Sequence, residues 1–391
     1  MSKSVISAAS DTDVDVAICG AGPVGLSLAA MLVTRGVTPS RIALIDAKTM
    51  QQASHDPRSL ALSYGSRQIL QEIGAWPLAA TAIHQIHVSR RGHFGRTLIE
   101  RDEFQLPALG YVTRYGTLVT ALATLPALAE IKLLRPVQVG ASNERDERVE
   151  LQLADGRMLS SALMVQAEGG LFGEQSEKSL RRDYEQVAIV AHVKASAPIA
   201  HRAFERFTDQ GPLALLPQDD AHGNNYALVW CVRPDTATAL LALDDAAFLA
   251  ALGQAFGTRL GRFIQTTPRN SFPLGLNAHP AASARTVAIG NAAQTLHPVA
   301  GQGLNLGLRD AAVLARLLAR AASPTTLRQF ADLRKTDRSL TIRLTDVMAR
   351  IFASAPDGAL SQTLLGLSLG LVDVVKPARR LLAEQMMFGR R

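Results

Sequence analysis

Residues 287–310 form the stretch whose residue types and spacing are best suited to binding a charged group. The apolar run 287–289 is typical of a short strand. A loop rich in glycine and proline follows, and leucines then recur at helical spacing from Leu304 to Leu318. A strand, a glycine loop and a helix in this order direct backbone N–H groups and the positive end of a helix dipole toward one point. Such a point suits a phosphate, a carboxylate or the electron-rich edge of a planar ring.

Two residue types make this loop suitable for a flat ligand. Pro298 restricts the backbone, and Gly301 and Gly303 remove side chains that would block a planar ring. Glycines alone would fit an ordinary strand–loop–helix connection equally well. The residues that we assign to the binding loop are Gly290, Asn291, Pro298, Gly301, Gln302, Gly303, Leu304 and Asn305.

A second glycine group lies near the N-terminus, where residues 14–46 have the pattern of a βαβ unit. An apolar strand over 15–19 is followed by a glycine turn and a helix over 26–34, and a second strand over 41–45 ends at Asp46. In such units the glycines allow the tight turn, the approach of a pyrophosphate and close helix–strand packing, and the acid binds a ribose. The loop 36–40 accommodates the long spacing to Asp46. The turn residues assigned to a dinucleotide are Gly20, Gly22, Pro23 and Gly25, and this unit alone does not distinguish FAD from NAD.

Composition restricts the class of protein. The 391 residues are 47% hydrophobic and 19% charged, which fits two or three globular domains. Two cysteines and the absence of metal-ligand spacing predict neither a disulfide framework nor a metal site, and Cys19 is expected in the core. The N-terminus lacks the apolar segment of a signal peptide, so a cytoplasmic location is expected.

The net charge of +7 is concentrated at the C-terminal end. Residues 328–391 hold eleven Lys or Arg and six Asp or Glu, a difference of +5. Because stacking aromatics are few there, we expect an anionic membrane surface or a partner protein rather than nucleic acid. The apolar run 364–375 is too short to span a bilayer. A core helix, an oligomer contact and membrane docking all remain open for it.

The rest of the chain predicts an α/β (α+β) architecture. Helices are expected over 66–73 and 111–128, over 244–256 as a capped helix ending at Gly257, and beyond 325. Strand-like runs broken by turn residues over 184–277, among them 202–207, predict an antiparallel sheet. His87 and His93, in the strand-like run 84–95, are interpreted as polar strand positions rather than metal ligands.

The loop at 290–310 resembles the second FAD fingerprint of the flavoprotein aromatic hydroxylases, G-D-A-A-H-x-x-x-P-x-x-G-Q-G-x-N-x-G-x-x-D. Asn291 and Gln294 depart from it, where the family has Asp and His. The segment 56–62 resembles the D-x-R-x-x-A-L loop of the ubiquinone-biosynthesis hydroxylases, and strings within 184–231 resemble their 2-polyprenyl-6-methoxyphenol hydroxylase branch. The positions that match the fingerprint are Gly290, Ala292, Ala293, Pro298, Gly301, Gln302, Gly303, Asn305, Gly307 and Asp310.

The resemblance implies a Rossmann-like FAD-binding domain (14–80, 111–182 and 280–325) interleaved with an antiparallel substrate-binding sheet (81–110 and 183–279), and C-terminal helices over 326–391. It assigns cofactor roles to Arg58 and Arg114. Glu168 stands where the family has an aspartate near the flavin, so its contact stays open. His297 either relays a proton from the substrate or is a structural loop residue, and Pro298 and its neighbours keep the reaction site dry.

The implied activity is hydroxylation of a polyprenylated phenol with O₂ in ubiquinone biosynthesis. FAD would be reduced by NAD(P)H or another donor and would act through a flavin C4a-hydroperoxide. Membership of a biosynthetic complex and peripheral contact with the inner face of the cytoplasmic membrane are further expectations. A flavin oxidase or dehydrogenase, and a non-catalytic FAD-bearing subunit, are the alternatives.

Overall fold

The computed structural model describes residues 12–91, 96–169, 178–218, 225–280 and 283–353, together with 384, 387 and 388. His93 and the apolar run 364–375 lie outside these residues.

The first of three sheets contains the predicted βαβ unit. Strands β1 (Val14–Cys19), β2 (Ile42–Ile45), β8 (Lys132–Leu134), β11 (Met158–Gln166) and β18 (Thr286–Ala288) run parallel, and β10 (Val149–Leu153) and β9 (Val139–Glu144) continue the sheet antiparallel. Apart from Asp15 near its start, β1 is apolar, because both of its faces are covered. Cys19 is buried there with a free thiol, as predicted.

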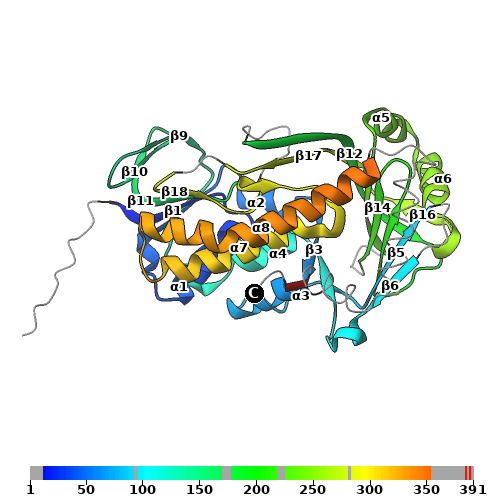
Figure 1. Ribbon diagram of the computed structural model, residues 1–391, viewed down its shortest axis with the longest axis horizontal. Coiled ribbons are helices and arrows are strands. Elements are labelled where there is room, and N and C mark those ends of the chain that lie inside the picture. The colour runs from blue at the N-terminus through cyan, green and yellow to red at the C-terminus, as the bar shows by residue number, and fades with distance from the viewer. Residues whose placement is uncertain are drawn as a thin grey trace, which may run out of the picture.

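Three helices cover one face of this sheet, namely α1 (Pro23–Thr34), α4 (Tyr115–Ala123) and α7 (Gln302–Leu318). Their apolar faces and the β1 and β11 side chains form the largest core cluster. Helix α7 continues into the long helix α8 (Pro324–Ala353), which lies alongside it (Figure 1). The predicted C-terminal helix is thus confirmed for its described part.

The second sheet is the predicted antiparallel one. Its order is β19 (Gln294–Thr295), β17 (Asn270–Ala278), β12 (Leu180–Ala195), β15 (Tyr226–Val232), β14 (Pro212–Pro217), β13 (Arg202–Phe207), β5 (Gln85–Arg90) and β6 (Arg96–Glu100), and β16 (Phe263–Thr266) also pairs with β12. Only the β13–β5 pair within it is parallel.

The outer face of this sheet is covered by α5 (Pro234–Ala242) and α6 (Asp245–Phe256), at the right-hand end of Figure 1. Helix α6 begins where the Asp244 side chain accepts a hydrogen bond from the Ala247 N–H and ends at Gly257, with φ +89°, as the sequence predicted.

A small third sheet joins the two large ones and corrects one prediction. Its order is β3 (Ser59–Ser63), β7 (Gly110–Arg114) and β4 (Thr81–Ile83). The helix predicted to begin at Tyr111 is wrong at its start, because residues 110–114 form the central strand of this sheet and the helix begins at Tyr115. Two short helices complete this region, α2 (Met50–Ser54) and α3 (Tyr64–Glu72).

Candidate FAD and substrate site

In the turn between β1 and α1, neighbouring backbone atoms leave no room for a Cβ atom at two of the glycines. A Cβ atom on Gly20, which has φ +110°, would lie 2.6 Å from the carbonyl carbon of Ala167. A Cβ on Gly25 would overlap the carbonyl oxygen of Gly20. These two positions therefore hold the start of α1 against the strand ends, as the dinucleotide pattern requires.

The start of α1 has the properties of an anion site. No side chain caps this helix at Gly22, and Pro23 supplies no N–H at its first position. Beside it, Asp46 Oδ2 accepts from the Ala21 N–H at 2.6 Å and Oδ1 accepts from the Lys48 N–H at 2.7 Å. Arg135, which the sequence did not single out, lies 3.5 Å from Asp46 Oδ1 with its side chain buried.

The second fingerprint packs directly on the first. Gly290 has φ +60°, and a Cβ on Gly307 would lie 2.8 Å from Val24 Cγ2 and 3.0 Å from Gly290 Cα. Helix α7 begins at Gly301, with φ +59° and no side-chain cap. The N-terminal parts of α1 and α7, which are distant in the sequence, therefore pack against each other at Val24.

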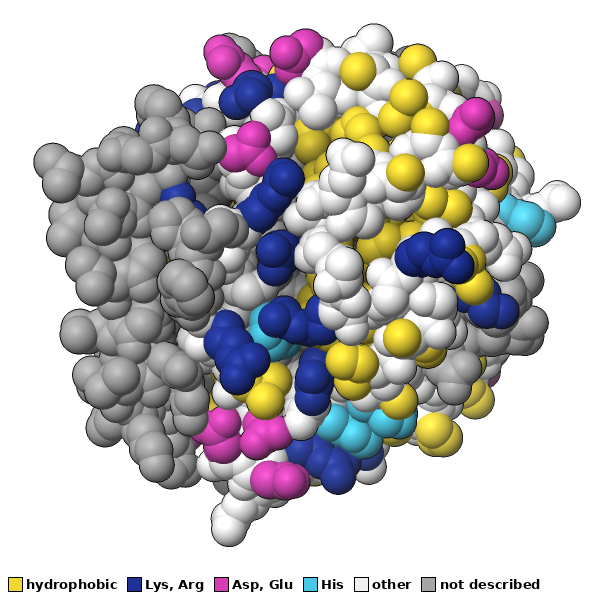
Figure 2. All heavy atoms as spheres, turned by 90° about the vertical axis from the view of Figure 1, so that its right-hand side faces the viewer, with side chains coloured by type: hydrophobic (Ala, Val, Ile, Leu, Met, Phe, Trp, Pro, Cys, Tyr) yellow, Lys and Arg dark blue, Asp and Glu magenta, His cyan; other side chains and the backbone are white. Residues whose placement is uncertain are grey.

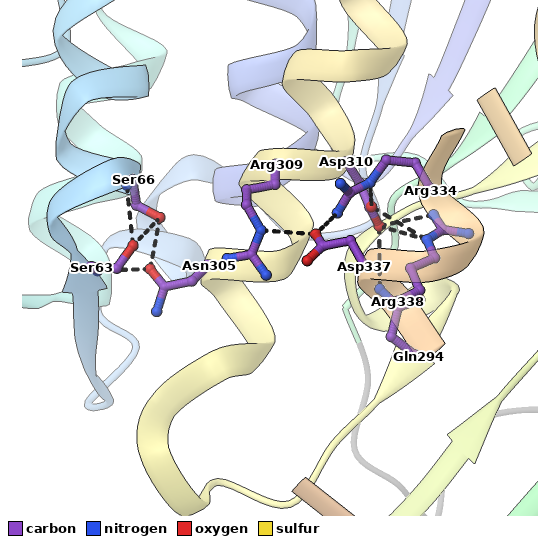
Figure 3. A network of polar contacts seen from close by, with 9 residues as sticks. All are labelled: Ser63, Ser66, Gln294, Asn305, Arg309, Asp310, Arg334, Asp337 and Arg338. Atoms are coloured by element: carbon purple, nitrogen blue, oxygen red, sulfur yellow. Dashed lines mark hydrogen bonds and ion pairs between the residues drawn. The ribbon is translucent and has the colours of Figure 1, made fainter. Parts of the chain in front are cut away.

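Asn305 anchors the second loop. Its Oδ1 accepts from the Ser63 N–H at 2.8 Å and from Ser66 Oγ at 2.7 Å, and its Nδ2 donates to the carbonyls of Ala61 and Gly301 at 3.0 and 2.7 Å (Figure 3). All four hydrogen-bonding positions of the amide are thus filled. The side chain thus fixes the loop and has no hydrogen-bonding position left for a ligand.

The middle of α7 is fixed by buried charges. Asp310 is fully buried and binds Arg334 Nε at 2.7 Å and Arg338 Nη2 at 2.8 Å, both from α8 (Figure 3). Gln294 Nε2 also donates to it, at 3.2 Å. Burial raises the pKa of Asp310, but the two guanidinium groups outweigh burial and hold it below its usual value. The last residue of the fingerprint therefore joins α7 to α8.

Of three other predicted cofactor residues, two lie beside the first turn. Arg58 forms a bidentate pair with Asp56 at 2.8 and 2.7 Å and lies 4.9 Å above the Tyr115 ring. The Tyr115 hydroxyl would be 3.1 Å from a Cβ on Gly22, so this arginine is on the same side as the turn. Arg114 is the partly buried N-cap residue of α4. Glu168 follows β11, is exposed, and places its backbone nitrogen against Gly20.

Most of the remaining predicted residues flank the short helix Val299–Gly301, and Asn291 lies in the short helix Gly290–Ala292. Pro298 precedes that helix and its carbonyl accepts from the Gly301 N–H at 2.9 Å. Gln302 is buried, Leu304 packs partly against the core, and Asn291 Oδ1 would be 3.8 Å from a Cβ on Gly303.

His297 is buried and both of its ring nitrogens are engaged. Nδ1 accepts from the Val299 N–H at 3.2 Å, so Nε2 carries the proton and donates to Gln186 Oε1 at 3.0 Å. Burial lowers the pKa of His297 to about 3. A neutral ring with both nitrogens bound to protein favours the structural alternative for this residue over the proton relay.

One face of the large antiparallel sheet looks toward the cofactor loops. The Gln186–His297 bond holds the middle of β12 over the second loop, and further along the strand His192 Nε2 lies 2.9 Å from Ser59 Oγ of β3. Since residues two apart in a strand share a face, 186, 188, 190 and 192 all point this way. The side chains between the two fixed points are apolar and small, which suits the wall of a substrate site.

The opposite end of the molecule carries a basic surface, which we define as Arg91, Arg96, Arg202, Arg206 and Arg259. Figure 2 shows a band of basic side chains with histidines beside it on this face. Burial and the charges of Arg259 and Arg91 lower the pKa of Arg206, and burial with Arg96 and Arg202 lowers that of Arg259. These guanidinium groups thus lie close enough to repel one another.

Within the residues that the structure describes, no three metal-ligating side chains form a group, and no helix has the length and apolar character needed to cross a membrane.

Comparison with known proteins agrees with this geometry. The model of the FAD binding domain family matches residues 13–342. The chain is 33% identical to the ubiquinone hydroxylase UbiL of Rhodospirillum rubrum, over 98% of this chain and 91% of that protein. It is 29% identical to the 3-demethoxyubiquinol 3-hydroxylase of Escherichia coli, over 79% and 80%. The p-nitrophenol 4-monooxygenase PnpA of Pseudomonas putida has a similar fold, with a TM-score of 0.76 at 16% identity over 97% of this chain and 99% of that one.

Proposed function

The chain belongs to the FAD-dependent monooxygenase family of the ubiquinone-biosynthesis hydroxylases, and from this premise we propose that its substrate is a polyprenylated phenol, 2-polyprenyl-6-methoxyphenol. FAD, reduced by NAD(P)H or another donor, supplies the oxygen-activating chemistry. Residues 14–80, 111–182 and 280–325 form the cofactor-binding part in this proposal, and 81–110 and 183–279 form the substrate-binding part.

The protein's own contribution is to bind and orient the cofactor. In our proposal the uncapped start of α1 binds the diphosphate of FAD, with Arg58 beside it, and Asp46 binds the ribose through the free lone pair of Oδ2. The uncapped start of α7 at Gly301–Gly303 faces the ring edge that becomes negative on reduction. His297 and Pro298 hold this loop in shape.

The observation that carries the cofactor assignment is the open space at Gly303. A Cβ there would meet only Asn291 Oδ1, at 3.8 Å, whereas Gly20 and Gly25 are closed in by backbone. Gly303→Val is therefore expected to fold with its stability near wild type and to lose FAD, because the added methyl groups enter space reserved for the ring. The absorbance of bound flavin per protein, measured beside a thermal unfolding curve, tests this. A folded, fully yellow variant would contradict it.

Isotope incorporation separates the proposed hydroxylase from the two alternatives. With ¹⁸O₂, a phenolic substrate and NAD(P)H, a hydroxylase places one labelled oxygen in the product. An oxidase would consume O₂ without added reductant and leave the product unlabelled. A non-catalytic subunit would give no phenol-dependent turnover.

The position of hydroxylation is tested in cells. A deletion strain is expected to accumulate the prenylated methoxyphenol, which mass spectrometry of extracted quinones would identify. Accumulation of an earlier or later ring intermediate would assign a different step.

We also propose that the protein takes its lipid-linked substrate at an anionic membrane surface. The basic surface supports this, because clustered exposed arginines are attracted to anionic lipid. The triple variant Arg91→Gln, Arg96→Gln and Arg259→Gln should lose flotation with phosphatidylglycerol vesicles, and wild-type binding should fall with salt.

The matched control for this test removes the same charge from another part of the molecule. The triple variant Arg145→Gln, Arg148→Gln and Arg157→Gln lies on the β9–β11 strands and their turns and should float as the wild type does. Equal binding by both triple variants would exclude the basic surface as the contact.

A further inference from the structure

Resting on the proposed function, we propose that Glu205 binds the phenolic hydroxyl of the substrate and accepts its proton. Glu205 lies on β13, between β14 and β5 in the sheet whose inner face looks toward the cofactor loops.

The two faces of β13 have different neighbours. Phe204 belongs to the outer cluster, where it packs against Phe256 of α6. Ala203 belongs to the inner cluster, with Ile83 of β4 and Val112 of β7. Because side chains alternate along a strand, Glu205 shares the inner face with Ala203.

Strand pairing places Glu205 in a row of apolar residues on that face. The paired residues run from Val190 (β12) through Val229 (β15) and Ala214 (β14) to Glu205, and then to Val88 (β5). Glu205 is the one ionisable side chain in this row. The row begins on β12 between the two points where that strand is bonded to the cofactor-binding part.

The Glu205 carboxylate is enclosed but has no partner among the described residues. No hydrogen bond or ion pair to it is found there, and the side chain keeps partial solvent access. The other titratable groups on this face are Cys231 of β15, His192 and Lys194 of β12 and Arg90 of β5. The small sheet opposite contributes the apolar Ile83 and Val112 and, two residues after Val112 on the same face of β7, Arg114. Burial and the nearby charge of Glu205 together raise the pKa of Cys231. A carboxylate in an apolar wall is costly unless a ligand bonds to it.

Burial raises the pKa of Glu205 to about 7, which suits proton exchange near neutral pH. The phenolic O–H bond breaks as an O–H bond forms on the carboxylate, and the electron pair stays on the phenolic oxygen. This charge makes the ring more reactive toward an electrophilic oxygen. When the hydroxylated carbon loses its own proton to water, the proton on Glu205 returns to the phenolic oxygen.

Binding of 2-methoxyphenol to the FAD-loaded oxidised enzyme tests this without turnover, through the change that it causes in the flavin absorbance. Glu205→Ala and Glu205→Gln should keep bound flavin, unfold at or above the wild-type temperature, and bind the phenol about 10- to 100-fold more weakly. The control Glu130→Ala removes an exposed carboxylate and should bind it normally.

The pH dependence of turnover distinguishes a catalytic Glu205 from one that only supports the structure. The wild-type kcat/KM for hydroxylation should fall below a pH near 7, and Glu205→Gln should lose this limb. Wild-type affinity and an unchanged pH profile in both Glu205 variants would overturn the assignment of Glu205 alone. Failure of the wild-type enzyme to bind or hydroxylate any phenol would overturn the proposed substrate class as well.

Discussion

At the scale of single residues, the glycines of the two fingerprints are required for two different reasons. Gly25 is needed by the protein itself, because the backbone carbonyl of Gly20 occupies the place of its Cβ. In our proposal Gly303 is needed by the ligand alone, because the space beside it is open. Gly25 is thus required for folding, whereas in our proposal Gly303 is required for cofactor binding.

Gly25→Ala is therefore expected to lower the folding stability and FAD content together, since α1 must move away from the strand ends. Flavin content and the unfolding temperature would both fall. Gly253→Ala is the matched control, because a Cβ at that position of α6 meets nothing within 4 Å and alanine favours a helix by about 1 kcal/mol. A stable, FAD-loaded Gly25→Ala protein would contradict the geometry at this turn.

His297 makes folding stability depend on pH. Its pKa of about 3 in the folded protein is below the roughly 6.5 of an unfolded histidine, so the unfolded chain takes up a proton first as the pH falls. Stability should therefore decrease below about pH 6.5, by about 2 kcal/mol at pH 5 from this residue.

The comparison variant for this effect is His297→Gln, which retains a hydrogen-bonding side chain but does not titrate. Urea unfolding at pH 7 and pH 5 should show a smaller loss for the variant than for the wild type. Equal losses would show that His297 is charged in the folded protein.

At the scale of secondary-structure elements, a buried charged network joins α7, the helix that follows the second glycine loop, to α8. Asp310→Asn should cost about 3–5 kcal/mol, because Arg334 and Arg338 lose their shared buried carboxylate. Asp155→Asn, which breaks an exposed pair with Arg157, should leave the unfolding free energy nearly unchanged. A small effect at Asp310 would mean that the two arginines find other partners.

The contribution of this network to folding stability should decrease in acid. The pKa of Asp310 is held low in the folded protein, so its contribution is present above the unfolded pKa of about 3.9 and is lost as the pH falls below it. Acid should therefore destabilise the wild type more than Asp310→Asn in this range.

Many of the helices and strands were predictable, because capping residues and hydrophobic periodicity within one segment indicate its type and its bounds. The caps of α6 and the strand Arg202–Phe207 were predicted at their observed positions. The start of the predicted helix 111–128 was wrong. Its first residues are compatible with a helix, but they pair with β3 and β4 and form a strand instead. Helix α5 was missed, since only the first-turn proline and acid mark it.

Only those residues of the candidate site that belong to a local sequence motif were predictable. Glycine positions and Asp46 are parts of local motifs. The roles of Arg135 and Glu205 depend on contacts between distant segments, and no spacing in the sequence marks them. The sequence also could not decide between the two roles of His297, because its partners Gln186 and Val299 come from different elements.

At the scale of the whole molecule, the two fingerprints lie on helices that pack on each other through Val24 and Gly307. A ligand that binds only this joined arrangement stabilises the folded state by mass action. Free FAD at about 100 times its dissociation constant should add about 2.7 kcal/mol to the unfolding free energy of the apoprotein. Gly303→Val should show no such increase, and an unfolding temperature unaffected by FAD in the wild type would contradict the arrangement.

The link between Asp310 and helix α8 has a genetic consequence. A stop codon directly after Ser323 would delete no residue that we propose to touch FAD, yet it would remove Arg334 and Arg338 and leave the buried Asp310 carboxylate without its counter-ions. Such an allele should yield a colourless protein although its coenzyme-contacting residues are intact.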